Sequence, residues 1–384
     1  MMEYKTHKKS KISCFLFLLV FILASKGCAP RLQQQEFITI GALLPLTGES
    51  SDEGLRALNG LHLAKEEINA SGGVLGKMLD IIVLNDRGDR EYIIEQYNRL
   101  LEKGVSAIIG SSYSGPTLAL AMTSVKDGMP IITPTASNPI ITEGRPNVFR
   151  TIFIDDYQAE AMANFAYNYL GARRAVVLAN QNFASYIRTA RVFAQTFTAL
   201  GGYIMAYEYF SSEDDFPYLL AKHAHDPPDV IFCPEDFIPA ARLINTAHEL
   251  GLRYTRLLGS DAWDGVLAYV FESEAMERAY YSAPFMFDDQ SEEVARFVRN
   301  YFDRFAQMPL TGSATAYICV YIIADAIERA GNTNREDIVS AMKSTNLDTI
   351  IGRMYFDHNN NPRTNVYVIQ IKGGEYSTYA KLSL

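Results

Sequence analysis

Short apolar runs alternate with amphipathic helical windows along most of the chain. Residues 38–44 form one apolar run, and an apolar stripe at helical spacing follows over 58–68. Glycines at 72–73 predict the end of that helix. The alternation then repeats, with strands expected at 79–84, 105–109 and 130–133 and helices at about 91–102 and 117–126.

The same rhythm restarts in the second half of the chain. Strands are expected at 175–179, 203–209, 230–232 and 257–258, with helices at about 187–200, 218–224 and 238–250. Strands that are apolar on both faces and alternate with helices are typical of parallel sheets covered by helices. We therefore predict an α/β protein with two doubly wound parallel-sheet lobes.

The two series meet at 148–154, which we expect to be the first crossing between the lobes. Three helical windows, near 292–306, 314–330 and 335–343, follow without a strand between them, and 353–356 with 366–371 are expected to form a closing antiparallel pair. This order predicts several crossings instead of one linker. The expected lobes are 36–149 with 285–350, and 150–284 with 351–384.

The first 27 residues have the pattern of a secretory signal. Four lysines within residues 5–11 precede an apolar run at 12–24, which is too short to span a bilayer comfortably. Cys28 follows a small residue and resembles the acylated cysteine of a bacterial lipobox, with 28–35 as a polar tether. We expect export to the periplasm or cell surface and lipid anchoring to the membrane; because Lys26 departs from the lipobox pattern, cleavage to a free soluble protein stays open.

Composition narrows the class of protein further. The net charge of −9 argues against nucleic acid as a partner. The chain is too long for one compact core. Cys233 and Cys319 have no neighbouring cysteine and are expected to be buried as small apolar side chains. We expect no cofactor or metal, and a monomer.

Three loops at the expected carboxyl ends of strands are rich in hydroxyl or charged groups. They are 110–116, 133–139 and 259–261. Ligands of open parallel sheets bind at such loops. Pro116 suits the first helical turn and Ser114 or Gly115 can cap it, so this helix N-terminus would offer free N–H groups and hydroxyls to a carboxylate, and Asp261 offers a carboxylate to an ammonium group. Together the loops indicate a receptor for a zwitterion.

Three further segments carry a resemblance to a known family. Residues 41–48, 59–76 and 85–89 resemble the type I periplasmic binding proteins of the leucine/isoleucine/valine-binding group, and the likeness spans nearly the whole chain after the signal. The resemblance implies a binding protein without chemistry of its own. It would close by hinge motion on a small amino acid or related amide and deliver it to the permease of an ABC importer.

The resemblance also implies ligand contacts. Ser114 and Ser137 match hydroxyl ligands of the α-carboxylate, whereas the carbonyl of Thr135 and the carboxylate of Asp261 match ligands of the α-ammonium group. The other expected contacts are the aromatic walls Phe183 and Phe237 and the loop residues Tyr113 and Ala136. Glu53 departs from the pattern because its slot is commonly aromatic. Either that wall is missing or the ligand carries an extra cationic or donor group.

Two alternatives remain at this point. The same fold can serve as a ligand-sensing module that feeds a chemoreceptor or a sensor kinase. A remote alternative is a serine hydrolase, because Gly110 and Ser112 faintly resemble a nucleophile elbow. That motif lacks its closing glycine, and His223, His225 and His248 have no spacing that singles out a base.

Overall fold

The computed structural model describes residues 1, 37–48, 51–270, 273–362 and 364–382. The expected signal, the tether and Cys28 lie outside the described residues. Within the described part, no helix is long and apolar enough to cross a bilayer.

A five-stranded sheet forms the first lobe. Its order is β2-β1-β3-β4-β5, and all of its neighbouring strands run parallel. The strands are β1 (Phe37–Leu44), β2 (Met78–Asn85), β3 (Ile108–Gly110), β4 (Ile131–Thr133) and β5 (Val148–Arg150). The helices of this lobe are α2 (Ser51–Ala70), α3 (Tyr92–Glu102), α4 (Ser114–Ser124), α10 (Glu292–Phe305), α11 (Thr311–Ala330) and α12 (Arg335–Lys343).

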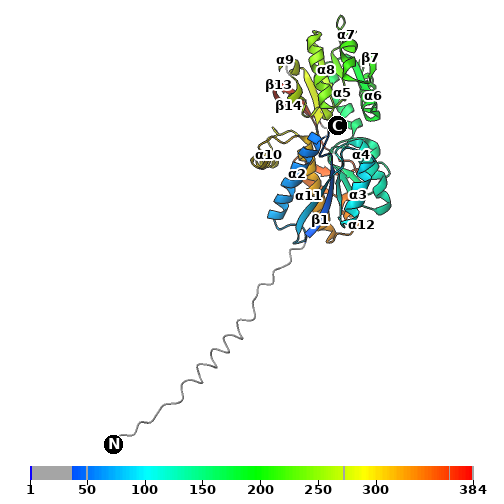
Figure 1. Ribbon diagram of the computed structural model, residues 1–384. Coiled ribbons are helices and arrows are strands. Elements are labelled where there is room, and N and C mark those ends of the chain that lie inside the picture. Colours follow the sequence, from blue (N-terminus) through cyan, green and yellow to red (C-terminus); the bar gives the residue numbers. More distant parts are fainter. Residues whose placement is uncertain (2–36, 49–50, 271–272, 363, 383–384) are drawn as a thin grey trace. The chain divides into compact units, whose positions relative to one another are not determined.

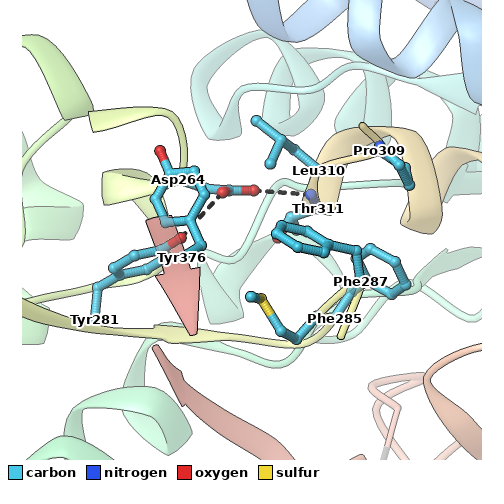
Figure 2. A pocket seen from close by; sticks show the side chains of 9 residues that line it. Asp264, Tyr281, Phe285, Phe287, Pro309, Leu310, Thr311 and Tyr376 are labelled. Carbon is cyan, nitrogen blue, oxygen red and sulfur yellow. Dashed lines mark hydrogen bonds between the residues drawn. The ribbon is translucent and has the colours of Figure 1, made fainter. Parts of the chain in front are cut away.

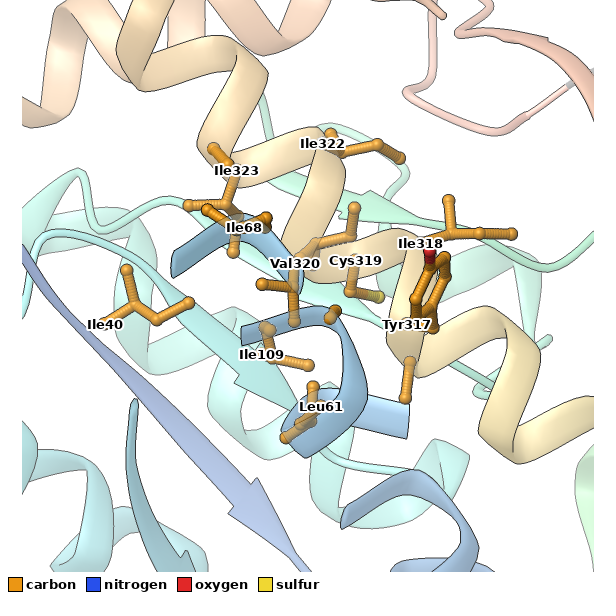
Figure 3. Packing of buried hydrophobic residues seen from close by; sticks show 14 of the residues in the cluster. Ile40, Leu61, Ile68, Ile109, Tyr317, Ile318, Cys319, Val320, Ile322 and Ile323 are labelled. Carbon is orange, nitrogen blue, oxygen red and sulfur yellow. The ribbon is translucent and has the colours of Figure 1, made fainter. Parts of the chain in front are cut away.

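Helices cover both faces of the first sheet (Figure 1). On one face, α2 and α11 pack together against apolar side chains of β1 and β3, such as Ile40 and Ile109 (Figure 3). On the other face, α3 and α4 bury a second apolar cluster. A Cβ added to Gly60 on α2 would lie 2.1 Å from the carbonyl oxygen of Ser313 on α11, so only glycine permits this close approach.

A seven-stranded sheet forms the second lobe, in the order β14-β13-β10-β9-β8-β6-β7. Its strands are β6 (Arg174–Asn180), β7 (Tyr203–Phe210), β8 (Val230–Phe232), β9 (Arg256–Gly259), β10 (Ala279–Ala283), β13 (Val366–Lys372) and β14 (Glu375–Leu382). The helices are α5 (Asp155–Asn164), α6 (Ala184–Ala199), α7 (Phe216–Ala221), α8 (Phe237–Glu249) and α9 (Ser273–Met276). β13 is antiparallel to β10 and β14, and the other pairs are parallel. The doubly wound α/β fold is thus confirmed.

The chain passes between the sheets three times. It leaves the first sheet between β5 and α5, returns between β10 and α10, and leaves again between β12 (Gly352–Tyr355) and β13. The expected pairing of 353–356 with 366–371 was wrong: β12 pairs with β11 (Asn346–Thr349) across a short turn. Met354 of β12 is fully buried in the α2–α11 core, and Phe356 packs against that core. The last crossing therefore lies beyond Phe356, not at 351.

Two smaller expectations can be compared with the structure. The helix expected from 117 begins at Ser114, three residues earlier, because the hydroxyl-rich loop itself supplies the first turn. Cys233 and Cys319 are free thiols and both are completely buried, as expected of small apolar side chains.

Candidate functional site

The two hydroxyl-rich loops of the first lobe lie side by side, after the neighbouring strands β3 and β4. Ser114 opens α4, and the first hydrogen bond of that helix runs from the Thr117 N–H to the Tyr113 carbonyl. The Ser114 amide therefore precedes the hydrogen-bonded part of the helix. The Ser114 hydroxyl accepts a 3.4 Å hydrogen bond from the Asn138 N–H, which leaves its own proton available to a ligand.

A buried arginine holds the second loop. Arg150 donates to the carbonyl oxygens of Ala136 and Asn138, at 2.8 Å each, and to the hydroxyl of Thr142. Burial lowers the pKa of Arg150 to about 10. One signal for this role was overlooked in the sequence, namely an arginine at the end of an otherwise apolar strand. Arg150 fixes the backbone on which Thr135 and Ser137 lie.

The second lobe contributes two carboxylates at the carboxyl end of its sheet. Asp261 follows β9 and starts a short 3₁₀ turn, and its N–H donates to Oε1 of Gln158 at 2.9 Å. Gln158 in turn donates to Oδ1 of Asp155, at the start of α5. The Asp155 N–H donates to the carbonyl of Ser137 at 3.1 Å. Asp261 thus lies on the opposite lobe from Ser114 and Ser137, and Asp155 connects the two sides.

Burial disfavours the ionised form of these two carboxylates. It raises the pKa of Asp261 to about 8, and the nearby Asp155 adds to the rise. Burial likewise raises the pKa of Asp155, although the hydroxyl of Ser137 and the charge of Arg150 oppose the shift. Asp155 is only 5 % exposed, and its Oδ2 has no hydrogen-bond partner. An ammonium group placed between them would stabilise both charges.

Glu53 points into the same region from the first turn of α2. Its buried Oε1 has no hydrogen-bond partner and lies against Gly312, where an added Cβ would be 2.2 Å away. Burial raises the pKa of Glu53 to about 7; Asp264 and Asp236 also raise it, whereas Arg56 and the hydroxyl of Thr135 lower it. Glu53 is therefore a neighbour of the predicted ammonium ligands and not an isolated surface charge.

The two side chains predicted as aromatic walls of the pocket, Phe183 and Phe237, differ in how far they are covered. The ring of Phe183 is 49 % exposed and lies 5.3 Å from that of Tyr186. The Tyr186 hydroxyl donates to Asp236 at 2.9 Å. Phe237 is partly buried, with the guanidinium carbon of Arg56 5.7 Å from its centroid. Phe237 is thus covered by the other lobe, whereas Phe183 lies at the margin.

Other neighbours of the candidate site escaped the sequence reasoning. They are Arg56, Asp155, Gln158 and Asp236, together with Tyr186. Burial and the carboxylates of Asp236 and Glu235 raise the pKa of Tyr186, and Tyr113 adds to the rise, so another expected contact residue lies near the second lobe. Asp155 and Asp156 are adjacent carboxylates directly after the first crossing. This pair is visible in the sequence but does not by itself indicate a ligand site.

A small pocket lies beside the candidate site, between the start of α11 and strands of the second lobe (Figure 2). Asp264 accepts from the Thr311 N–H at 2.8 Å and from the Tyr281 hydroxyl at 3.2 Å. Asp264 therefore joins α11 of the first lobe to the second. The nine residues that line the pocket do not include Asp261 or the two serines.

The described residues do not assemble the catalytic groups of a serine hydrolase. Ser112 is buried, and its carbonyl accepts from the Thr135 hydroxyl at 2.8 Å. Neither Ser112 nor Ser114 has a hydrogen bond to a histidine within the described ranges. The same part of the chain holds no group of three or more histidine, cysteine or acidic side chains that could bind a metal ion.

Two α/β lobes, three crossings and polar groups that converge from both sheets define a two-lobed ligand-binding protein. The chain belongs to the periplasmic binding protein family, whose model matches residues 38–375. The resemblance found in the sequence is thereby confirmed.

Relatives and solved structures agree with this assignment. A Leu/Ile/Val-binding protein of Rhizobium johnstonii is 25 % identical over 346 residues, which are 88 % of this chain and 92 % of the relative. A leucine-binding protein from Thermotoga maritima has 29 % identity and a TM-score of 0.83, covering 90 % of this chain and 99 % of its own. A branched-chain amino acid transporter substrate-binding protein from Streptococcus pneumoniae, solved with isoleucine, has 25 % identity and a TM-score of 0.83, covering 91 % and 99 %.

Proposed function

We propose that this protein is the extracytoplasmic solute-binding component of an ABC importer and that it binds a small amino acid or related amide between its lobes. The observation that carries the proposal is the position of Asp261 and Asp155 opposite the hydroxyls of Ser114 and Ser137. Relatives named for leucine, isoleucine and valine binding support the ligand class. Because one of the similar structures is named as a branched-chain amino acid transporter substrate-binding protein, we favour transport over a role as a sensor module.

The proposed binding mode follows the charge distribution. The ligand carboxylate accepts from Ser114, from Ser137 and from the free N–H groups at the start of α4. Asp261 and the carbonyl of Thr135 take the ammonium group, and Phe237 faces the side chain. Because the two ends of the ligand are held by different lobes, binding favours the closed arrangement over more open ones.

A binding screen tests this proposal directly. Ligand-free protein is prepared by unfolding, dialysis and refolding, and its melting temperature is measured with single amino acids, amides, polyamines and short organic acids. We expect a rise with one or more α-amino acids or their amides, followed by a micromolar or tighter dissociation constant in calorimetry. A rise only with organic acids that lack nitrogen would contradict the proposed ammonium site.

We further propose that the protein has no catalytic activity. Ser112 and Ser114 have no hydrogen bond to a histidine within the described residues, and the family is one of binding proteins. After prolonged incubation with the protein, the bound ligand is expected to be recovered unchanged by mass spectrometry. Loss of the ligand with appearance of a product would revive the hydrolase alternative.

The membrane partners belong to the same proposal. We expect a monomer that is acylated at Cys28 and docks on the membrane subunits of a permease. Labelling of cells with an alkyne fatty acid should mark the wild-type protein and not Cys28→Ser. Label that persists in the variant would exclude Cys28 as the anchor.

A further inference from the structure

We infer that Gln158 is a positioning residue of the ammonium site, whose amide group holds Asp261 and Asp155 around one ammonium group. This inference rests on the proposed function, because it assumes that the ligand is an α-amino acid. Gln158 lies near the start of α5 and is only 1 % exposed. It acts through the two acids and not on the ligand itself.

The two ends of the Gln158 amide are distinguished by their partners. Oε1 accepts from the Asp261 N–H at 2.9 Å and from the Ser282 hydroxyl at 2.8 Å. A main-chain N–H can only donate, so the amide oxygen and not the NH₂ group must face it. The NH₂ group therefore points the other way and donates to Oδ1 of Asp155 at 3.2 Å. One side chain thus connects the main chain of one acid with the carboxylate of the other.

Separate elements of the second lobe meet at this amide. Asp155 opens α5, and Gln158 follows at the spacing that places both on the same face of the helix. Asp261 comes after β9, and Ser282 belongs to β10, the parallel neighbour of β9. The Asp155 N–H also donates to the Ser137 carbonyl at 3.1 Å, so the network continues into the ligand loop of the first lobe. A displaced amide would therefore release both acids.

The network leaves one oxygen of Asp155 to a ligand. Gln158 occupies Oδ1, whereas Oδ2 has no hydrogen-bond partner among the described residues, although Asp155 is only 5 % exposed. A buried oxygen without a donor is costly, and an ammonium group brings several donors. Burial and the neighbouring Asp155 raise the pKa of Asp261 to about 8, and a hydrogen bond from Gln158 opposes the rise. The amide is neutral, so it orients both acids while the positive charge comes from the ligand.

Calorimetry on Gln158→Met tests the inference, because methionine has a similar length but forms none of these hydrogen bonds. The probes are leucine and isocaproate, which has the same carboxylate and side chain without the amino group. If another common amino acid raises the melting temperature more than leucine does, that amino acid and its deaminated acid are used. We expect the substitution to weaken binding of the amino acid at least about tenfold and that of the deaminated acid less than about threefold, because a hydrogen bond to a charged group is lost.

Two further variants separate positioning from a general loss of structure. Gln158→Asn keeps the amide but shortens its reach by one carbon, and it should show the same difference between the two probes. Thr255→Val removes another buried hydrogen bond of this lobe, from the Thr255 hydroxyl to the Pro228 carbonyl at 2.8 Å, at the opposite end of β9. It should lower the melting temperature and leave the affinities for both probes unchanged.

The possible results separate this inference from the proposed function. Equal losses for both probes, or no loss, in the Gln158 variants would overturn the positioning role while amino-acid binding stands. If no amino acid binds the folded wild type, the proposed function fails and the inference fails with it. A crystal structure of the wild type with the amino acid needs no variant: the ammonium nitrogen should lie within hydrogen-bond distance of both Asp155 and Asp261. Contact with only one of these acids would overturn the inference.

Discussion

At the scale of single residues, the candidate site is marked by Asp261 and Asp155, two carboxylates that form no ion pair among the described residues and whose pKa values are raised. Asp261 and Asp155 share a hydrogen-bond network through Gln158, and the Asp155 N–H donates to the Ser137 carbonyl. The sequence indicated Asp261 and the serines because they follow strands whose carboxyl ends form a ligand edge. Asp155 was overlooked because an acidic residue at the start of a helix is ordinarily only a helix-end charge.

Removing the charge of Asp261 should weaken amino-acid binding by more than about thirtyfold, because the ammonium group would lose a buried ionic partner. Asp261→Asn keeps the size of the side chain, so calorimetry on this variant measures the charge. Asp226→Asn, an exposed partner of Arg174, is the matched control. Unchanged affinity in Asp261→Asn would show that the ammonium group binds elsewhere.

Ser114→Ala should weaken amino-acid binding less than Asp261→Asn does, by about three- to tenfold. The substitution removes one neutral donor, while the N–H groups of α4 still hold the carboxylate. Calorimetry with the same ligand measures the difference. A loss as large as that in Asp261→Asn would mean that Ser114 carries more of the binding energy than the helix terminus does.

At the scale of elements, the order of strands and helices could be predicted because each apolar run and each amphipathic stripe is local. Which strands pair with each other could not be predicted, and β12 shows the reason. Its sequence suits any antiparallel partner, and the choice of β11 depends on the short turn and on burial of Met354 in a distant core. The role of Arg150 was hidden for the same reason, since its acceptors lie in a loop that reaches it only after folding.

The crossing of α2 and α11 gives a stability prediction. Gly60→Ala should destabilise the protein by about 1–3 kcal/mol, because the added methyl group would overlap the Ser313 carbonyl. The melting temperature should fall by several degrees. Leu55→Ala, on the same helix at a position 46 % exposed, should change it little. A higher melting temperature in Gly60→Ala, as helix propensity alone would give, contradicts the close crossing.

At the scale of the whole molecule, two lobes and repeated crossings were predicted from the restart of the strand–helix rhythm and from the missing linker. The contacts between the lobes were not predicted, because they depend on side chains far apart in the sequence. Arg56 against Asp264 and Asp264 against Thr311 are examples. These contacts place Glu53 beside acids of the other lobe, which no local pattern in the sequence reveals.

The buried acids also predict how ligand binding depends on pH. The pKa values of Glu53, about 7, and Asp261, about 8, lie above their ordinary values. Glu53 faces Arg56, Asp236 and Asp264, and Asp261 faces Asp155 and Gln158. Stability from these two groups is therefore fully present below their unfolded pKa values near 4 and is lost as the pH rises through about 7 and 8.

A bound ammonium group should reverse this loss of stability with rising pH, because it favours the ionised form of the acids. The ligand-induced rise in melting temperature should thus be larger at about pH 8.5 than at about pH 6. Paired melting curves with and without ligand measure it, and the dependence should flatten in Glu53→Gln. A rise that shrinks as the pH increases would contradict the ionic role of these acids.

The central claim is that opposite lobes hold opposite ends of one ligand, and a binding cycle tests it most directly. Calorimetry compares the amino acid with its deaminated analogue in wild type, Asp261→Asn and Ser114→Ala. Asp261→Asn is expected to weaken the amino acid more than about thirtyfold and the analogue less than about threefold, whereas Ser114→Ala should weaken both alike. Equal losses for both ligands in Asp261→Asn would contradict the account.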